Sequence, residues 1–223
     1  SNDYIKSNLW KYLQTFSLIS LNLNSSKELQ ILLSGEKIKS RKKDINNLKS
    51  MKKLKKNQGI LFWITGLSGS GKTAIAERIK KKISNVYGPT ITISGDELRD
   101  VFNLNKFSRK ERLKYALAYG KFCKCITKKN INIIFSTVSL FDKVRRWNRT
   151  NIKNYLEIYI KSDIKKIILK KNKFFYKGNY KNVIGKNLKA EFPKSPDIII
   201  RNNFTISLNK LSKELLIKII KKI

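Results

Sequence analysis

Eight consecutive residues have the composition and spacing to hold the phosphates of a nucleotide. The run 66–73 (GLSGSGKT) fits the pattern GxxxxGK[ST]. Its glycines allow backbone dihedrals that other residues avoid, so successive N–H groups can point at phosphate oxygens. Lys72 would reach the β- and γ-phosphates as a catalytic group, and the Thr73 hydroxyl would bind Mg²⁺. The residues that we expect to bind ATP are Gly66, Leu67, Ser68, Gly69, Ser70, Gly71, Lys72 and Thr73.

A carboxylate follows the next strand that the sequence predicts. Asp96 lies two residues after the run 90–94 (TITIS), at the carboxyl end of that strand. In this position it could bind Mg²⁺ or accept the proton of an attacking hydroxyl. The alternative interpretation is that Asp96 caps the N-terminus of a helix over 97–102. The two roles do not exclude each other.

Strands and helices that would position these residues alternate from Gly59 onward. Apolar runs predict strands at 60–65, 90–94, 132–138, 155–161 and 197–200. Helical spacing predicts helices at 73–83, 97–102, 109–129, 142–154, 163–171 and 207–223, with a basic, loop-rich stretch at 173–196. This alternation predicts an α/β chain with a three-layer P-loop NTPase fold, a mostly parallel sheet with helices on both faces. Ligands of such sheets bind at the carboxyl ends of the strands.

The first part of the chain differs in character from the rest. Residues 1–58 hold thirteen basic and four acidic side chains and few periodic apolar runs. We therefore expect 1–57 to be a basic N-terminal extension or linker, and 58–223 to be the kinase domain. One hypothesis is that the functional protein begins at Met51, which is the only methionine in the sequence.

The composition excludes several classes of enzyme. The 223 residues include no histidine, which excludes Ser-His-Asp hydrolysis, Cys-His proteolysis and HExxH metal sites. Cys123 and Cys125 provide no basis for a disulfide framework, and their spacing in a predicted helix places them on different sides. The 50 basic and 15 acidic residues give a net charge of +35. This charge indicates either a polyanionic partner or a general bias toward lysine, and in both cases it favours a small anionic substrate.

No apolar run approaches the roughly 20 residues that span a bilayer, and no signal peptide precedes the first strand. We therefore expect a soluble, cytoplasmic protein with no membrane partner. About 150 residues follow the phosphate loop, and no guanine-binding motif or motor motif is present, so a kinase of small molecules is favoured over GTPases and motors. A further hypothesis is a nucleic-acid-binding protein that uses the phosphate loop as a switch, but no recognisable nucleic-acid module supports it. We therefore expect no nucleic-acid partner.

Two further runs carry a resemblance to a known family. Residues 95–103 (GDELRDVFN) and 107–112 (FSRKER), together with GLSGSGKT, are similar to the motifs DGDxxRxxxN and GFSxxDR of adenylyl-sulfate kinases. The resemblance covers roughly residues 58–200. It implies transfer of the γ-phosphate of ATP to the ribose 3′-hydroxyl of adenylyl sulfate, a step of sulfate assimilation.

The resemblance also implies roles for individual residues. Asp96 would bind Mg²⁺ or act as the base, and Phe107 would stack on the base of the acceptor. The residues implied to bind the acceptor are Arg99, Asn103, Phe107, Arg112 and the lid residue Lys173. Further matches to family positions are the catalytic Ser139, the helix arginines Arg145 and Arg149, the lid residue Lys177, and Glu191 with Pro193 of the segment AEFP.

Five positions depart from the family pattern. Where the adenylyl-sulfate kinases have the first Asp of DGD, this chain has Ser94, and an asparagine of the family is replaced by Tyr115. The residues after the family's serine are Leu140 and Asp142, and an aromatic of the lid aligns with Val183. The donor side is therefore intact and the acceptor side is altered. The alternative acceptor is another nucleotide, such as a CDP-linked compound of surface-polysaccharide synthesis, and a homodimer is an assembly that the sequence leaves open.

Overall fold

The computed structural model describes residues 57–171, 176, 178 and 180–223. The predicted extension therefore lies outside the described residues except for Asn57, and its boundary stays a prediction. Lys173 and Lys177 also lie outside them.

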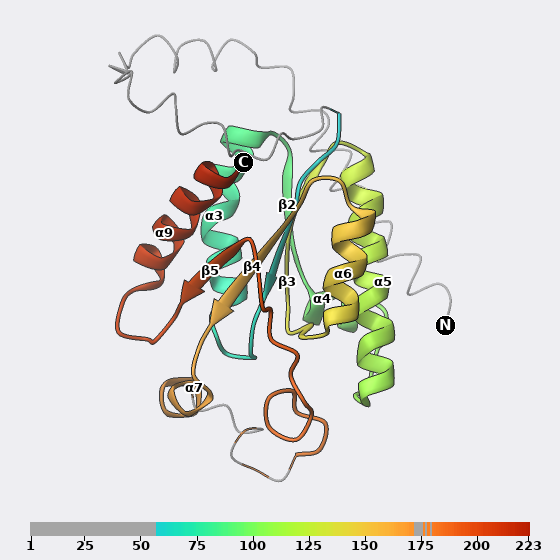
Figure 1. The fold of residues 1–223 in the computed structure, drawn as a ribbon, viewed down its shortest axis with the longest axis vertical. Helices are drawn as coiled ribbons and strands as arrows, with labels where there is room; N and C mark the ends of the chain where they lie inside the picture. Colours follow the sequence, from blue (N-terminus) through green and yellow to red (C-terminus); the bar gives the residue numbers. More distant parts are fainter. Residues whose placement is uncertain (1–56, 172–175, 177, 179) are drawn as a thin grey trace. The chain divides into compact units, whose positions relative to one another are not determined.

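The described residues form one parallel sheet with the order β2-β3-β1-β4-β5 (Figure 1). Every neighbouring pair of strands runs parallel. The strands are β1 (Leu61–Thr65), β2 (Thr90–Ser94), β3 (Asn132–Thr137), β4 (Tyr155–Lys161) and β5 (Ile198–Arg201). Because β1 lies in the middle, the phosphate loop that follows it emerges at the centre of the carboxyl edge of the sheet.

Helices cover both faces of the sheet. In Figure 1, α3 (Lys72–Tyr87) and α9 (Leu208–Lys222) lie on one face, and α5 (Arg109–Lys128) and α6 (Asp142–Asn151) lie on the other. Two shorter helices, α4 (Gly95–Val101) and α7 (Ile164–Lys171), follow the carboxyl ends of β2 and β4. The predicted three-layer P-loop fold is confirmed.

Apolar spacing explains how α3 attaches to the sheet. Ile75, Ile79 and Ile83 recur every fourth residue, and all three are buried in one cluster with β-strand residues and with α9. Every residue of β1 is buried, as expected of a strand that helices cover on both faces. The rigid packing of β1 and α3 therefore fixes both ends of the phosphate loop.

Several predicted helix bounds were wrong. The helix α3 continues to Tyr87, four residues beyond its predicted end, and stops at Gly88. Two other bounds have reasons visible in the backbone. The helix α4 begins at Gly95, not at residue 97, because Ser94 forms a capping box with Glu97. The Ser94 hydroxyl accepts from the Glu97 N–H at 3.1 Å, and the Glu97 carboxylate accepts from the Ser94 N–H at 2.6 Å. Asp96 is therefore not the N-cap residue. The helix α6 ends at Asn151, since Ile152 already has extended dihedrals.

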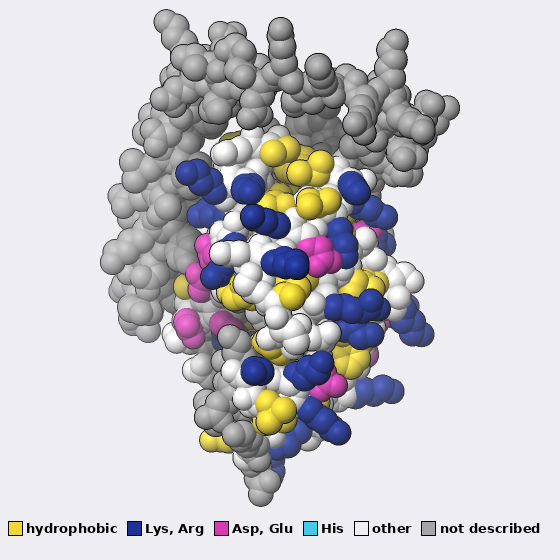
Figure 2. Space-filling model, turned by 90° about the vertical axis from the view of Figure 1, so that its left-hand side faces the viewer, with side chains coloured by type: hydrophobic (Ala, Val, Ile, Leu, Met, Phe, Trp, Pro, Cys, Tyr) yellow, Lys and Arg dark blue, Asp and Glu magenta, His cyan; other side chains and the backbone are white. Residues whose placement is uncertain are grey.

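The basic side chains are spread over the surface on at least one face. Figure 2 shows Lys and Arg distributed across the face that α3 and α9 cover, with few acidic side chains between them. This distribution favours the interpretation of the charge as a general lysine bias. Within the described part of the chain, no helix combines the length and the apolar character needed to cross a bilayer. Cys123 is buried and Cys125 is exposed, as their spacing predicted.

Candidate active site

The phosphate loop depends on glycine at its two ends. Gly66 has φ 152° and Gly71 has φ 92°, and both values lie in the region that side chains with a Cβ avoid. A Cβ at Gly66 would also lie 2.5 Å from the Ile160 carbonyl oxygen. Lys72 is only 6% exposed, and its Nζ donates to the Leu67 carbonyl at 2.7 Å. The lysine side chain thus folds back over the loop whose phosphate it would contact.

A buried asparagine supports the loop from the far side. Asn202 follows β5, is 2% exposed, and donates from Nδ2 to the Ser70 carbonyl at 3.0 Å. Its Oδ1 accepts from the Phe204 N–H at 3.0 Å. The sequence analysis did not single out Asn202. The one signal that could have found it is a polar residue directly after the last buried strand.

Two predicted Mg²⁺ ligands lie along the same edge of the sheet. The Thr73 hydroxyl is 3.1 Å from the Ser136 hydroxyl of β3. Asp96 follows β2, in which Ser94 pairs with Ser136, and its side chain is 83% exposed. Mg²⁺ commonly uses one or two protein oxygens and completes its shell with water and phosphate oxygens. Thr73 and Asp96 fit that requirement, and the described residues include no group of three or more His, Cys, Asp or Glu suited to a metal ion.

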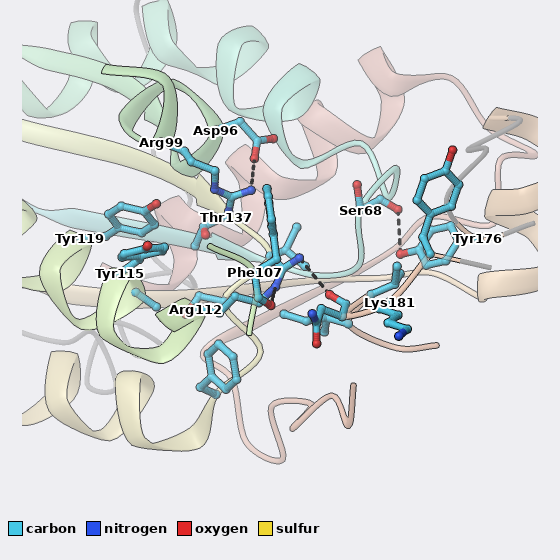
Figure 3. Close-up of a pocket in the computed structure, with 18 residues that line it drawn as sticks. Ser68, Asp96, Arg99, Phe107, Arg112, Tyr115, Tyr119, Thr137, Tyr176 and Lys181 are labelled. Atoms are coloured by element: carbon cyan, nitrogen blue, oxygen red, sulfur yellow. Dashed lines mark hydrogen bonds and ion pairs between the residues drawn. The ribbon is translucent and has the colours of Figure 1, made fainter. Parts of the chain in front are cut away.

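A cavity of about 550 Å³ opens beside the loop (Figure 3). Its walls come from α4, α5, the residues after β3 and the segment 180–184. The predicted site residues that line it are Ser68, Asp96, Arg99, Phe107, Arg112 and Ser139. Ser68 belongs to the phosphate loop, so the cavity adjoins the place where the phosphates of a nucleotide would lie.

An aromatic ring close to two guanidinium groups is the main feature of this cavity. The guanidinium carbons of Arg99 and Arg112 lie 5.2 and 5.1 Å from the centre of the Phe107 ring. Burial, and after it the charge of Arg99, lowers the pKa of Arg112 from its ordinary value. Two cations held this close in a part-buried cavity attract an anion, which would relieve their mutual repulsion.

Two polar atoms of the cavity wall have no hydrogen-bond partner among the described residues. They are the Ser139 Oγ and the Arg99 Nε, and both are buried. Buried polar groups are nearly always hydrogen-bonded, so such atoms usually meet water or a ligand. Both atoms are therefore available to form a hydrogen bond with a molecule bound in the cavity.

Some of the predicted residues lie elsewhere. Asn103 is exposed, has φ 51° and does not line the cavity. Arg145 and Arg149 instead form ion pairs with the buried Glu157 of β4, at 3.3 and 3.1 Å. Asp142 pairs with Arg146 at 3.1 Å and does not line the cavity either. The Asp142 carboxylate therefore contacts an arginine of α6 and does not change the charge of the cavity lining.

Two of the altered positions do face the cavity, together with tyrosines that the sequence analysis missed. Tyr115 and Val183 line it, and so do Tyr119 and Tyr176. Burial raises the pKa of Tyr176 to about 12, and its hydroxyl donates to the Ser68 carbonyl at 3.4 Å. Tyr119 follows Arg112 at the helical spacing of seven, and this spacing is a signal that could have found it.

Comparison with known proteins agrees with this geometry. The family model described as adenylylsulphate kinase matches residues 58–201. The chain belongs to the adenylylsulphate kinase family. The resemblance that the sequence motifs carried is thereby confirmed, and the protein is a kinase, a nucleotide-binding phosphotransferase.

The relatives of this chain carry the names of different acceptors. A cytidine diphosphoramidate kinase of Campylobacter jejuni is 34% identical over 73% of this chain and 97% of its own length. An adenylyl-sulfate kinase of Clostridium kluyveri is 31% identical over 68% of this chain and 79% of its own. The solved structure of a Mycobacterium tuberculosis APS kinase with AMPPNP and APS has a TM-score of 0.65 and 20% identity, and covers 73% of this chain and 98% of that one. This last likeness concerns the fold.

Proposed function

We propose that this kinase moves the γ-phosphate of ATP to a ribose hydroxyl of a small anionic nucleotide, and that its acceptor is a cytidine diphosphate conjugate such as cytidine diphosphoramidate. The observation that carries the proposal is the partly exposed Phe107 ring beside two guanidinium groups in a cavity next to the phosphate loop. An aromatic ring suits a base, and paired cations suit the anionic groups of the same molecule.

On the donor side, the loop would bind the phosphates of ATP with its backbone N–H groups and with the positive end of the α3 dipole. Lys72 would leave its contact with the Leu67 carbonyl to reach the β- and γ-phosphates. Thr73 and Asp96 would hold Mg²⁺, which supplies positive charge for the transferred group. Phosphoryl transfer needs mainly alignment and electrostatic stabilisation, and these residues provide both.

On the acceptor side, Arg99 and Arg112 would bind the diphosphate part of the nucleotide. Ser139 Oγ and Arg99 Nε have no hydrogen-bond partner among the described residues, so they are available to hydrogen-bond the acceptor. Asp96 pairs with Arg99 at 3.7 Å and is exposed toward solvent. From that place it could accept the proton of the attacking hydroxyl as an alternative to binding the metal.

The choice of base follows from the altered positions. Val183 lines the cavity where the resemblance places an aromatic residue of the adenylyl-sulfate kinases. One stacking contact contributes about 1–3 kcal/mol per base, and a purine presents more ring area to stack than a pyrimidine does. Replacement of that one aromatic residue by Val183 therefore removes more stacking free energy from adenine than from cytosine. The similarity to the Campylobacter jejuni kinase supports the same choice.

Adenylyl sulfate is the second candidate acceptor, because the family model carries its name and because paired arginines would bind its phosphosulfate group equally well. With that acceptor the protein would act in sulfate assimilation. We include a cytoplasmic location in the proposal, since ATP is the donor. A homodimer stays a prediction.

A panel of acceptors separates the two candidates. The full chain would be incubated with Mg-ATP and, in parallel, cytidine diphosphoramidate, adenylyl sulfate, CDP or no acceptor, and the release of ADP would be followed. We expect the highest kcat/KM with cytidine diphosphoramidate. A higher kcat/KM with adenylyl sulfate would replace the first candidate by the second. No acceptor-dependent ADP release would refute the proposed activity.

A further inference from the structure

A single carboxylate outside the cavity joins the segments that form its walls. Glu191 Oε1 pairs with the Arg109 guanidinium, and Glu191 Oε2 accepts from the Asp142 N–H at 2.7 Å. The backbone of Glu191 adds two bonds, since its N–H donates to the Leu140 carbonyl at 2.9 Å and its carbonyl accepts from Arg145 Nη1 at 2.7 Å. These four contacts connect Glu191 to the start of α5, to the start of α6 and to the residues after β3.

Three of these partners, Arg109, Leu140 and Asp142, lie within two residues of side chains that line the cavity. Arg109 lies between Phe107 and Arg112, and its guanidinium carbon is 5.3 Å from the centre of the Phe141 ring, which also lines the cavity. Leu140 and Asp142 flank Phe141 in sequence. A shift of the Glu191 carboxylate would therefore move two walls of the cavity relative to each other.

The segment that carries Glu191 forms a third wall. Arg112 Nη2 donates to the Asn182 carbonyl at 3.0 Å, and Arg109 Nη1 donates to the Lys189 carbonyl at 3.3 Å. Residues 182–184 line the cavity. Glu191 and Arg109 thus fasten this segment over the N-terminal end of α5, close to Phe107.

The electrostatics favour an ionised Glu191 at neutral pH. The hydrogen bond from the Asp142 N–H, and then the Arg109 guanidinium, lower the pKa of the Glu191 carboxyl, although partial burial opposes them. The side chains of Arg109 and Glu191 are 45% and 29% exposed. Exposed ion pairs contribute little to global stability, so orientation is the larger effect of this pair.

We propose that Glu191 is a positioning residue for the acceptor. Its carboxylate, with Arg109, holds residues 107–112, which include the N-terminal end of α5, at a fixed position relative to residues 139–141. Acceptor binding then depends on Glu191, and ATP binding does not, because the phosphate loop is fixed separately by β1, α3 and Asn202. The inference rests on the proposed function in one respect, that the cavity holds the acceptor.

The kinetic test uses isosteric and conservative variants. Glu191→Gln keeps an oxygen for the Asp142 N–H and removes the charge that Arg109 contacts. We expect it to raise the acceptor KM about tenfold and to leave the ATP KM within about twofold, while Glu191→Asp restores part of the loss. Arg109→Gln should have a similar effect, and the double variant should be no worse than the worse single variant, since both changes break one contact.

A matched control removes an ion pair of the same type elsewhere. Glu214→Gln breaks the exposed pair with Lys218 on α9 and changes the net charge equally. It should leave both KM values unchanged. If Glu191→Gln leaves the acceptor KM unchanged, or raises both KM values together, the inference is overturned and the proposed function is not.

A second measurement does not depend on turnover. Hydrogen–deuterium exchange of the full chain, without ligands, should become faster in Glu191→Gln over residues 105–112 and 139–143 and stay unchanged over 66–73. Unchanged exchange in the first two regions would overturn the inference even if every acceptor in the panel fails. Failure of all acceptors with faster exchange in those regions would instead refute only the proposed function.

Discussion

The proposed donor and acceptor sides of this kinase are built in different ways. The donor side is one contiguous run, 66–73, between a buried strand and a buried helix. The acceptor cavity is assembled from α4, α5, the residues after β3 and the segment 180–184, which are distant in sequence. The first depends on glycine backbone conformations, and the second on side-chain contacts between segments.

This difference agrees with the place of two of the five departures from the family pattern. A substitution in the loop would meet a backbone constraint such as the 2.5 Å approach of a Gly66 Cβ to the Ile160 carbonyl. A substitution in the cavity changes only which groups face the acceptor. Tyr115 and Val183, two of the altered positions, both line the cavity. Acceptor identity can therefore change in this fold while the donor site stays the same.

The largest expected effect is on the donor side. Lys72→Ala removes the buried ammonium that would stabilise the transferring phosphate, and we expect a loss of roughly 10³-fold in kcat with every acceptor. Release of ADP under saturating substrates measures it. Lys80→Ala, an exposed position of the same helix, is the control and should retain full activity. Comparable activity of the Lys72→Ala and Lys80→Ala proteins would remove the loop from the mechanism.

A smaller effect is expected on the acceptor side. Phe107→Ala removes a stacking surface that contributes about 1–3 kcal/mol, so kcat/KM for the acceptor should fall about 10- to 100-fold while the ATP KM is unchanged. Steady-state kinetics with each substrate varied in turn provide the check. Phe192→Ala, an exposed aromatic outside this cavity, is the matched control. A rise in the ATP KM alone would show that Phe107 belongs to the donor side.

The support of the loop by Asn202 links stability to ATP binding. Asn202→Ala leaves the buried Ser70 carbonyl without its side-chain donor, which should lower the free energy of unfolding by about 1–3 kcal/mol. We expect the ATP KM to rise severalfold and the acceptor KM to stay the same. Urea denaturation and initial rates measure the two effects, with the exposed Asn203→Ala as control. An acceptor KM that rises with the ATP KM would break the separation of the two sides.

The smallest expected effect is on the free energy of unfolding at acidic pH. The pKa of Glu191 is lowered in the folded protein by the Asp142 N–H and then by Arg109, so the carboxylate stabilises the fold above its ordinary pKa. This stabilisation is lost as the pH falls through the lowered pKa. The free energy of unfolding of Glu191→Gln should therefore decline less steeply below the ordinary carboxyl range than that of the wild type. Parallel slopes in urea denaturation at several acidic pH values would contradict this.

The sequence predicted the sheet and the glycine-rich loop after β1 because their signals are local. The run 66–73 stands directly between a predicted strand and a predicted helix, and that context is what identifies such a loop. The register of Ile75, Ile79 and Ile83 likewise predicted α3 and its buried face. Arg99, Phe107 and Arg112 were found through motif spacing, and the structure brings all three into one cavity.

The contacts that the sequence could not predict join residues far apart in the chain. Asn202 contacts a loop residue 132 positions away, and Glu191 contacts Arg109 across 82 positions. No periodic pattern of apolar residues in the sequence indicates such distant pairs. The same limit explains Arg145 and Arg149, which the motif placed near the site but whose partner, Glu157, could be identified only from the packing of α6 against β4.

The most direct test of the account follows the phosphate itself. The full chain would be given ATP labelled at the γ-phosphate with equal amounts of cytidine diphosphoramidate and adenylyl sulfate, and the labelled products would be separated and identified by mass. We predict one labelled phosphate on the cytidine compound, little on the adenylyl compound, and none on either with Lys72→Ala. Label found only in inorganic phosphate, or remaining wholly in ATP, would contradict the claim that this cavity presents a nucleotide hydroxyl to the phosphate loop.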